Sequence, residues 1–348
     1  MKTIRVGIIG VSGYGGAETA RLVLQHPSAV LTYVTSNTYL GQPLHCAVPG
    51  ISRSPGLVCD AFEPESAASR CDLLFLAGEA GLAMKIAPAL LDAGLKIIDL
   101  SADFRLSDPQ QYAHWYKAEH SAPQLLAEAI YGLPELNRTR IRDSRLIANP
   151  GCYPTSAILA LAPLRNAPFV DYGSIVIDSL SGVSGAGRSK FGPDTHFSEV
   201  NESVRPYGVG GTHRHTPEIE QALSRIWDRP VIVTFTPHLA PITRGILTTA
   251  YVTLTAEPPD LRTYFEEFYK DDSFVVLLDA GTFPTTKNVY ATNNCHISLA
   301  LDRRANRLIV VSAIDNLTKG MAGQAVQNMN IMYGLEEATG LPRSAVWP

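Results

Sequence analysis

The sequence predicts an α/β fold in two parts: a Rossmann-type doubly wound parallel sheet, and an α+β catalytic domain with a mostly antiparallel sheet. Three observations predict it. A glycine-rich turn separates the first apolar strand from the first helix. Apolar strands and helices then alternate up to about residue 148, which indicates parallel βαβ units. After the cysteine at position 152, strands dominate and helical patterns become few, which is typical of an antiparallel sheet.

Length and composition restrict the class of protein. The 348 residues suffice for two domains, and a net charge of −4 without basic clusters argues against a nucleic-acid partner. No apolar run reaches the roughly 18–20 residues of a membrane span. The first strand follows the N-terminus at once, so we expect no signal segment and no membrane association. Five cysteines without a C-x-x-C pair predict reduced thiols in a cytoplasmic protein.

The first strand, residues 4–9, leads into Gly10-Val11-Ser12-Gly13-Tyr14-Gly15-Gly16 and then into a helix over residues 17–24. The glycines at 10, 13 and 16 form a variant of the dinucleotide-binding fingerprint. In that fingerprint they permit a tight turn, close approach of a pyrophosphate and close packing of the helix. We therefore predict that Gly10, Ser12, Gly13, Tyr14, Gly15 and Gly16 bind a dinucleotide.

The end of the second strand, residues 29–34, indicates which dinucleotide. An NAD site usually places an acid there to hold the ribose 2′-hydroxyl. Here the chain reads Thr35-Ser36-Asn37-Thr38, and the next carboxylate is Asp60. Neutral donors such as Ser36 tolerate a 2′-phosphate, so NADP(H) is the predicted cofactor. The alternative is that these residues are only solvated loop polars.

Further strands at 72–77 and 95–100, with a helix at 81–91 between them, continue the alternation. Ser101 and Arg105 follow the last of these strands, at the sheet edge where ligands bind. Arg105 could hold a phosphate or carboxylate with its forked donors, or it could form a surface ion pair with Asp103 or Asp108. Residues 106–144 lack clear periodicity and are interpreted as an excursion that re-enters the sheet near 131–135.

The cysteine at 152 stands between an apolar strand, residues 146–148, and a buried helix that begins near Ser156. Pro150 and Gly151 force a tight turn before it. Helix N-terminal N–H groups favour a thiolate and could hold the oxyanion that forms when the thiolate attacks a carbonyl. The alternative is a buried, inert cysteine, and position alone does not decide between the two.

The second half is predicted to be mainly strands. They are expected at residues 174–180, 231–236, 246–255, 295–301 and 308–313, with helices after 216 and at 260–269. A final helix over residues 321–333 is expected to pack back on the first domain.

Polar loops between these strands hold candidate functional groups at residues 181–188, 210–218 and 236–245. His213 and His215 precede a helix with Thr216 as its predicted N-cap and Pro217 at its first position. With His238 they could form a metal site, but the spacing matches no zinc motif, so we predict no metal. One histidine paired with Cys152 could instead act as base and then as acid.

Three motifs together resemble the N-acetyl-γ-glutamyl-phosphate reductases of arginine biosynthesis. They are residues 149–155, 10–16 and 315–320, supported by the loops 181–188 and 212–218. Aspartate-semialdehyde dehydrogenase and glyceraldehyde-3-phosphate dehydrogenase are wider relatives. Ser156 departs from the family pattern, in which a smaller residue follows the threonine.

The resemblance implies an NADP-dependent oxidoreductase of the EC 1.2.1 class. It would reduce N-acetyl-γ-glutamyl phosphate to N-acetylglutamate 5-semialdehyde and phosphate through a thioacyl group on Cys152, the third step from glutamate. It also implies an NADP-binding domain of residues 1–148 and 316–348. Residues 149–315 would form a catalytic and dimerisation domain, in a homodimer or homotetramer.

The resemblance also implies site residues. His215 would be the acid and base, with His213 as the alternative, and Asn316 would hold the nicotinamide carboxamide. The substrate or its phosphate would be bound by residues from several loops, namely Ser101, Arg105, Asn149, Arg188 and Arg244.

Two other interpretations remain open at this stage. A related dehydrogenase could act on aspartyl phosphate, because acyl chain length does not follow from the physics of the sequence. A non-catalytic NADP-binding sensor would need the glycine turn, but it would have no use for a cysteine at a helix start paired with a histidine.

Overall fold

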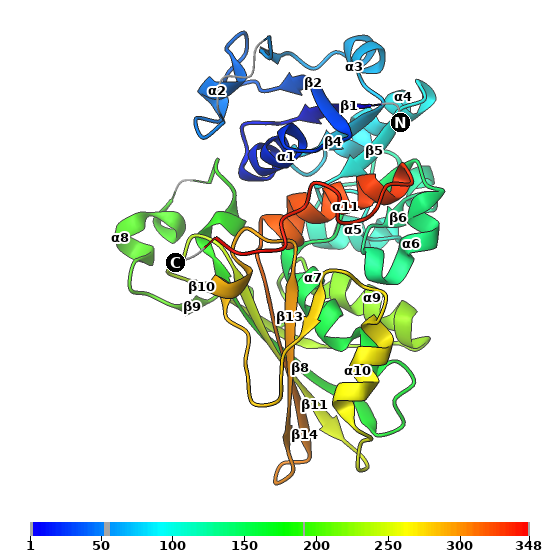
Figure 1. The fold of residues 1–348 in the computed structure, drawn as a ribbon, viewed down its shortest axis with the longest axis vertical. Helices are drawn as coiled ribbons and strands as arrows, with labels where there is room; N and C mark the ends of the chain where they lie inside the picture. The colour runs from blue at the N-terminus through cyan, green and yellow to red at the C-terminus, as the bar shows by residue number, and fades with distance from the viewer. Residues whose placement is uncertain (1–2, 52–55, 191, 347–348) are drawn as a thin grey trace. The chain divides into compact units, whose positions relative to one another are not determined.

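The computed structural model describes residues 3–51, 56–190 and 192–346, and the chain divides into two compact units (Figure 1). Unit 1 comprises the described residues up to Pro150, together with Gly187–Ser189 and Met321–Leu341. Unit 2 comprises Gly151–Ala186, Lys190–Gly320 and the described residues from Pro342 onward.

The unit boundaries differ in detail from the predicted domains. Unit 1 resumes at Met321, five residues later than the expected 316, because the turn before it hydrogen-bonds within unit 2. The last residues leave unit 1 again. The carbonyl oxygens of Pro342 and Arg343 accept hydrogen bonds from Asn293 and Asn294, both in unit 2.

Unit 1 contains an all-parallel sheet of seven strands in the order β3-β2-β1-β4-β5-β7-β6. Its strands are β1 (Ile4–Ile9), β2 (Ala29–Thr35), β3 (Cys59–Asp60), β4 (Leu73–Leu76), β5 (Lys96–Asp99), β6 (Ile130–Tyr131) and β7 (Leu146–Ala148). The strand order reverses between β1 and β4, and ligands of such sheets bind beyond the carboxyl ends of the strands at that point. The predicted Rossmann-type sheet is confirmed.

Helices pack against this sheet and account for the segment that lacked periodicity. They are α1 (Tyr14–Leu24), α2 (Leu44–Ala47), α3 (Pro64–Arg70), α4 (Ala83–Asp92), α5 (Pro109–Tyr116), α6 (Pro134–Arg142) and α11 (Gly323–Met332). Residues 106–144 thus contain the α-helices α5 and α6 and a short 3-10 helix, Pro123–Leu126, as well as strand β6. Helix α5 begins where the Asp108 carboxylate accepts a hydrogen bond from Gln110 N–H. Both helices are short and polar, so they lack the apolar stripe that would predict them.

Helix α11 returns to unit 1 and contacts α1 and α6. Every residue of α11 is buried, including the amides Gln324, Gln327, Asn328 and Asn330. The amide group of Asn330 donates to the carbonyl oxygens of Glu337 and Thr339. The helix is therefore held by polar contacts as well as by an apolar face.

Unit 2 contains a mixed sheet of seven strands in the order β12-β13-β14-β11-β8-β10-β9. The strands are β8 (Val170–Gly182), β9 (Arg205–Pro206), β10 (Thr234–Ala240), β11 (Ile246–Leu254), β12 (Val275–Leu277), β13 (Cys295–Asp302) and β14 (Arg307–Ile314). The pairs β8–β10 and β12–β13 are parallel, and the other four pairs are antiparallel. This confirms the predicted, mostly antiparallel sheet.

The described part of unit 2 contains four α-helices: α7 (Cys152–Leu161), α8 (Phe197–Val200), α9 (Thr216–Trp227) and α10 (Leu261–Tyr269). Helix α7 packs on β11 and β14. Its Ser156 hydroxyl lies 2.8 Å from the Ser312 hydroxyl of β14, so the residue that departs from the family pattern has a buried polar partner.

One strand prediction was displaced. The sequence placed a strand at 231–236 and a polar loop at 236–245, whereas β10 continues to Ala240. Pairing with β8 decides the register, because each residue from Thr234 to Ala240 has a partner on that strand. His238 therefore lies in a strand, opposite Leu180, and the loop shrinks to residues 241–245.

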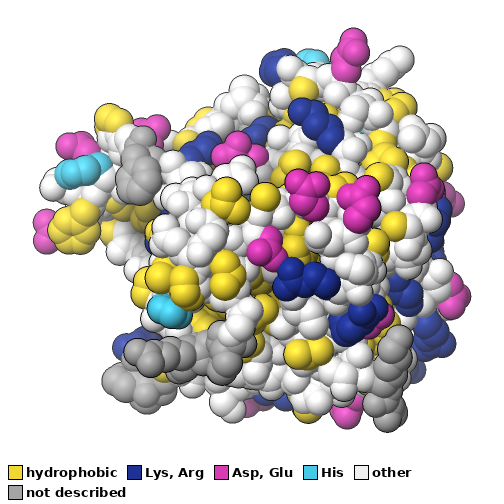
Figure 2. Space-filling model, turned by 90° about the horizontal axis from the view of Figure 1, so that it is seen from above, with side chains coloured by type: hydrophobic (Ala, Val, Ile, Leu, Met, Phe, Trp, Pro, Cys, Tyr) yellow, Lys and Arg dark blue, Asp and Glu magenta, His cyan; other side chains and the backbone are white. Residues whose placement is uncertain are grey.

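The surface shows no sorting of charge on the face seen in Figure 2, where basic and acidic side chains are interspersed with apolar ones. Within the described residues, none of the helices combines the length and apolar character needed to cross a bilayer.

Candidate active site and cofactor-binding turn

The glycine turn after β1 lets a ligand approach the protein backbone closely. Gly10 has φ +84°, and a Cβ there would lie 2.8 Å from the carbonyl oxygen of Ala77. A Cβ at Gly16 would lie 2.3 Å from Gly10 O, so the helix start packs directly on the turn. Gly13 is the N-cap of α1 and has no side chain to cap the first N–H groups. These residues fit a dinucleotide pyrophosphate.

Ser36 lies at the carboxyl end of β2, beside the glycine turn. Its hydroxyl donates to the Ser12 hydroxyl at 2.9 Å and accepts a hydrogen bond from Tyr39 N–H at 3.3 Å. The first carboxylate after this strand, Asp60, forms an ion pair with Arg70 at 2.6 Å. The structure therefore places Ser36 and Ser12, both predicted to bind the cofactor, in one hydroxyl cluster.

Cys152 is the first residue of α7, which begins four residues before the predicted start near Ser156. Gly151 is the N-cap, and the Thr155 hydroxyl donates to its carbonyl oxygen at 2.9 Å. A Cβ at Gly320 would lie 2.9 Å from the Cβ of Cys152. The final glycine of the 315–320 motif thus leaves room for the cysteine.

The exposure of the other thiols separates them from Cys152. Cys59, Cys71 and Cys295 are buried, whereas Cys152 and Cys46 are partly exposed. Burial raises the pKa of the Cys59 and Cys71 thiols, which makes them poor nucleophiles. Cys46 lies within the short helix α2, so Cys152 alone combines access with a position at the start of a long helix.

The start of α7 is linked to the start of α9. The backbone N–H of Gly151 donates to the carboxylate of Glu218 at 2.8 Å, and Glu218 is almost fully buried. Glu218 is the third residue of α9, a position where a sequence ordinarily indicates a capping box within its own helix. Glu218 was not among the predicted site residues, because the partner of its carboxylate lies 67 residues away in the sequence.

His215 is the N-cap of α9, one position earlier than the predicted Thr216. Thr216 and Pro217 are consequently the first two helical residues. His215 itself therefore lies at the helix start, and its ring centroid is 5.9 Å from that of Tyr153. Tyr153 directly follows Cys152, so the neighbour of the thiol contacts the imidazole.

His213 lies in a box of aromatic rings. Its ring centroid is 5.6 Å from Tyr153, 5.3 Å from Tyr207, 4.9 Å from His215 and 5.4 Å from Phe235. Its Nδ1 accepts a hydrogen bond from the His215 backbone N–H at 3.1 Å. Burial, with a contribution from Arg214, lowers the pKa of His213 to about 4. It is therefore neutral at physiological pH.

Two tyrosines complete the wall of this site. The Tyr207 hydroxyl donates to the Tyr153 hydroxyl at 3.0 Å, and Tyr153 donates to the carbonyl oxygen of His238 at 3.2 Å. Burial raises the pKa of Tyr153 and raises the pKa of Tyr207 to about 12. Both remain neutral and fix the ring that touches the two histidines.

Arg105 is buried in unit 1 rather than at the surface. Its Nε donates to the Asn149 carbonyl oxygen at 2.9 Å, and its Nη2 donates to that of Leu100 at 3.0 Å. Asp103 accepts hydrogen bonds from Gly81 N–H, Met84 N–H and the Tyr112 hydroxyl. Because Asn149 lies three residues before Cys152, Arg105 supports the backbone that leads to the thiol.

Two other predicted substrate ligands have internal partners in unit 1. Asn149 is fully buried, donates to Met321 O at 3.0 Å and accepts from the Asn328 amide at 3.2 Å. The Ser101 hydroxyl donates to Asp99 at 2.9 Å. Burial and Asp103 raise the pKa of Asp99 to about 7.

Arg244 and Asn316 connect loops within unit 2. Arg244 forms an ion pair with the buried Asp315 at 2.9 Å and donates to the Thr318 hydroxyl. Asn316 accepts from Gly245 N–H at 2.7 Å and donates to the Ser184 hydroxyl at 2.9 Å. Both residues fix the turn that ends with Gly320.

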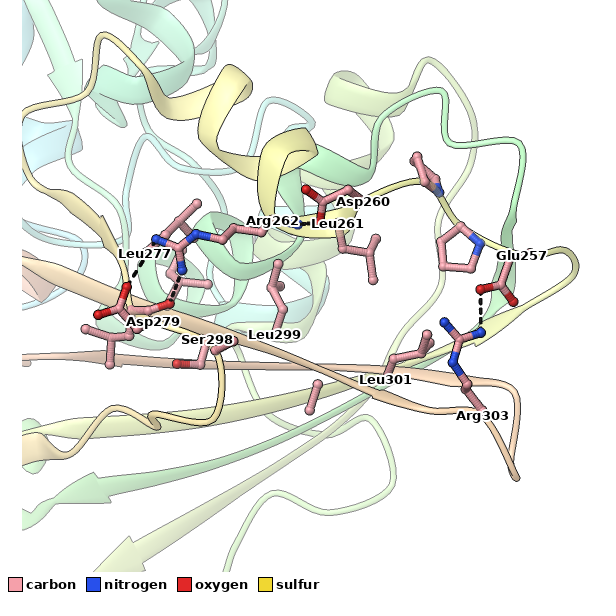
Figure 3. A pocket seen from close by; sticks show the side chains of 16 residues that line it. Glu257, Asp260, Leu261, Arg262, Leu277, Asp279, Ser298, Leu299, Leu301 and Arg303 are labelled. Carbon is pink, nitrogen blue, oxygen red and sulfur yellow. Dashed lines mark hydrogen bonds and ion pairs between the residues drawn. The ribbon is translucent and has the colours of Figure 1, made fainter.

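A cavity of about 290 Å³ lies elsewhere in unit 2, between α10 and β13 (Figure 3). Ion pairs between Arg262 and Asp279 and between Arg303 and Glu257 border it, and Leu299 lies between them. No residue predicted to be functional lines this cavity. Among the described residues, no group of three or more His, Cys, Asp or Glu side chains is placed to hold a metal ion.

Comparison with known proteins places this geometry in a family. Residues 5–144 match the family described as semialdehyde dehydrogenase, NAD binding domain, and residues 152–316 match semialdehyde dehydrogenase, dimerisation domain. The chain belongs to the semialdehyde dehydrogenase family, and within it to the N-acetyl-gamma-glutamyl-phosphate reductases.

Curated relatives support the second, narrower assignment. The N-acetyl-gamma-glutamyl-phosphate reductase of Symbiobacterium thermophilum is 52% identical over 97% of both chains. That of Pelotomaculum thermopropionicum is 50% identical over 99% of both.

Solved structures share the fold at low identity. Aspartate semialdehyde dehydrogenase II of Vibrio cholerae, complexed with ASA, has a TM-score of 0.74 at 18% identity, covering 96% of this chain and 99% of that one. Aspartate semialdehyde dehydrogenase with NADP from Candida albicans has a TM-score of 0.70 at 14% identity, covering 95% and 99%.

Proposed function

We propose that this chain reduces N-acetyl-γ-glutamyl phosphate to N-acetylglutamate 5-semialdehyde with release of phosphate, with Cys152 as nucleophile and His215 as acid and base. One observation carries the residue assignment: the Glu218 carboxylate links the start of α7, where Cys152 lies, to the start of α9, where His215 lies. A linked nucleophile and imidazole are what acyl transfer through a thioester requires.

The chemistry at Cys152 begins with loss of its thiol proton to His215. The sulfur then attacks the γ-carbonyl carbon, a C–S bond forms, and the C–O bond to the phosphate breaks. First-turn N–H groups of α7 lie where they can stabilise the oxyanion, and Pro154, which has no N–H, does not add a donor. Once the thioester carbon has been reduced, His215 protonates its oxygen and then takes that proton back, so that the carbonyl re-forms as the C–S bond breaks. The aldehyde leaves and Cys152 is left as the thiolate.

The two histidines divide their roles. His213 is neutral because burial lowers its pKa to about 4, and its Nδ1 is occupied by the backbone N–H of His215. It therefore orients the segment that carries His215. This supports His215 as the residue that moves the proton and His213 as a positioning residue.

NADP(H) is the cofactor, and when bound it supplies the hydride that reduces the thioester carbon. The turn Gly10–Gly16 would hold its pyrophosphate, and Ser12 and Ser36 would face its adenosine ribose. Asn316 is retained as the proposed partner of the nicotinamide carboxamide.

The remaining proposed ligands serve the substrate's anionic ends. Arg105 has a planar fork suited to phosphate, and Ser101 and Arg244 are assigned to the same task. The internal contacts of Asn149 favour a supporting role for it. We propose a cytoplasmic homodimer or homotetramer assembled through the domain that the family description names for dimerisation.

The reaction is tested in the reverse direction. Purified protein is given phosphate, NADP and either N-acetylglutamate semialdehyde or aspartate semialdehyde, and NADPH formation is followed at 340 nm. The expected result is phosphate-dependent reduction of NADP with the first aldehyde. Preference for aspartate semialdehyde would favour the alternative substrate, and no turnover with either would favour a sensor.

A further inference from the structure

The loop after β8 delivers an arginine to the nucleotide-binding unit. The chain leaves β8 at Gly182, and only Gly187–Ser189 of the following segment belong to unit 1. Gly187 has φ +88°, a backbone conformation that favours glycine and turns the chain there. The residue placed by this excursion is Arg188, which the sequence had assigned to the substrate.

Arg188 lies against the glycine turn. Its Nη1 donates to the carbonyl oxygens of Ser12 at 3.0 Å and Ala47 at 2.6 Å, and its Nη2 donates to the Tyr39 hydroxyl at 3.3 Å. The guanidinium carbon also lies 5.8 Å from the centre of the Tyr39 ring. The cation is therefore held in place by carbonyl, hydroxyl and ring contacts, and among the described residues it has no carboxylate partner.

The same cluster contains the residues at the end of β2. Tyr39 N–H donates to the Ser36 hydroxyl, and that hydroxyl donates to the hydroxyl of Ser12. Ser12, Ser36, Tyr39 and Arg188 thus form one connected group at the position where sheets of this kind bind the adenosine ribose. Asp60, the first carboxylate after β2, is already paired with Arg70.

We propose that Arg188 binds the 2′-phosphate of NADP(H) and so determines the preference for it over NAD(H). A guanidinium without a carboxylate partner among the described residues, beside two hydroxyl groups, favours a phosphate, which it can bind with forked, charge-assisted hydrogen bonds. An acid at this position would favour a free 2′-hydroxyl instead. The proposal rests on NADP(H) being the cofactor, and it replaces the expectation that Arg188 binds substrate.

Ligand binding tests this without turnover. Calorimetry is used to measure the affinity of the wild type and of Arg188→Gln for 2′,5′-ADP, 5′-AMP, NADP and NAD. The variant should bind 2′,5′-ADP and NADP at least about tenfold more weakly, while its affinity for 5′-AMP and NAD stays within about twofold, since tenfold equals about 1.4 kcal/mol. Arg205→Gln, which removes an exposed arginine paired with Asp194, is the matched control.

Two further variants keep the test decisive. Arg188→Lys retains the charge without the fork, so it should fall between the wild type and Arg188→Gln. Ser36→Asp should weaken the binding of NADP and leave the binding of NAD unchanged. It replaces Arg188→Gln in the test if that variant shows no thermal unfolding transition. If Arg188→Gln loses affinity for 2′,5′-ADP and 5′-AMP equally, or for neither, the proposal is overturned. A wild type that binds neither dinucleotide overturns the proposed function instead.

Discussion

Two helix starts in this molecule have nearly the same backbone and different chemistry. Helix α1 follows β1 through N-cap Gly13, with φ −72° and ψ 159°. Helix α7 follows β7 through N-cap Gly151, with φ −67° and ψ 156°. Neither glycine has a side chain to cap the helix, so both helices present backbone N–H groups at their first turn.

The difference lies in the first helical residue and in what packs beside it. At α1 the residue is Tyr14, which is 42% exposed, and the rest of the turn is glycine apart from Val11 and Ser12. At α7 it is Cys152, enclosed by Gly320 and followed by Tyr153, which contacts two histidines. We therefore propose that the same backbone frame serves anion binding at α1 and nucleophilic attack at α7, according to the first helical residue and its neighbours.

The largest expected effect comes from removing that side chain. Cys152→Ser should lower kcat by at least about 10³-fold, because a serine hydroxyl is a far weaker nucleophile than a thiolate. NADPH affinity, measured by quenching of its fluorescence, should not change, because the glycine turn belongs to unit 1. Loss of both turnover and NADPH binding in this variant would contradict the assignment of different functions to the two helix starts.

The imidazoles beside α7 should have unequal effects. His215→Asn should lower kcat by a factor on the order of 10²–10⁴, the range for a general acid–base group. His213→Asn should act mainly on KM, because the neutral ring only positions its neighbours. Steady-state kinetics of both variants decide the matter, and the opposite ranking would exchange the two roles.

Two glycine substitutions test the two starts in parallel. Gly320→Ala places a methyl group 2.9 Å from the Cβ of Cys152. It should lower kcat by about 10²-fold, the cost of displacing a reactive group by about 1 Å. Gly16→Ala presses on Gly10 O and should raise the Kd for NADPH instead. Gly192→Ala, where an added Cβ would meet no described residue within 4 Å, is the control, and a change in kcat there would undermine the comparison.

Arg105 lies between the two sites in sequence and should show a smaller, selective effect. Arg105→Ala should raise the KM for phosphate in the reverse reaction by about tenfold, the loss of a charge-assisted pair, and alter the KM for NADP less. Arg105→Lys separates charge from the two carbonyl contacts. If the KM for phosphate is unchanged in Arg105→Ala, Arg105 does not bind phosphate and only supports the backbone at Asn149.

The smallest effect concerns stability. The pKa of His213 is lowered to about 4 in the folded state, against 6.5 when unperturbed. Between pH 6.5 and 4 the His213 imidazole is protonated in the unfolded chain but not in the folded chain. The free energy of unfolding therefore falls as the pH drops through this range. His213→Gln should flatten this dependence, measured by denaturant unfolding across that range. A parallel curve for the variant would contradict the assignment.

The sequence by itself determined the local features of both sites. Glycine spacing predicted the turn before α1, and Pro150 and Gly151 predicted the turn before α7, because these residues restrict or free the backbone wherever they occur. Runs of apolar residues predicted the longer strands of both sheets for the same local reason, whereas the short strands β3, β9 and β12 were not predicted. Short polar helices such as α5 escaped prediction because their burial comes from neighbours and not from their own periodicity.

Only the tertiary structure decided which distant side chains meet. Arg188 reaches Ser12 across 176 residues of sequence, and Glu218 reaches Gly151 across 67. Pairing with β8 moved His238 from a loop into a strand. Burial among aromatic rings made His213 neutral and distinguished it from His215, two residues away. Such differences depend on desolvation and on long-range hydrogen bonds, and neither of these can be predicted from a periodic pattern in the sequence.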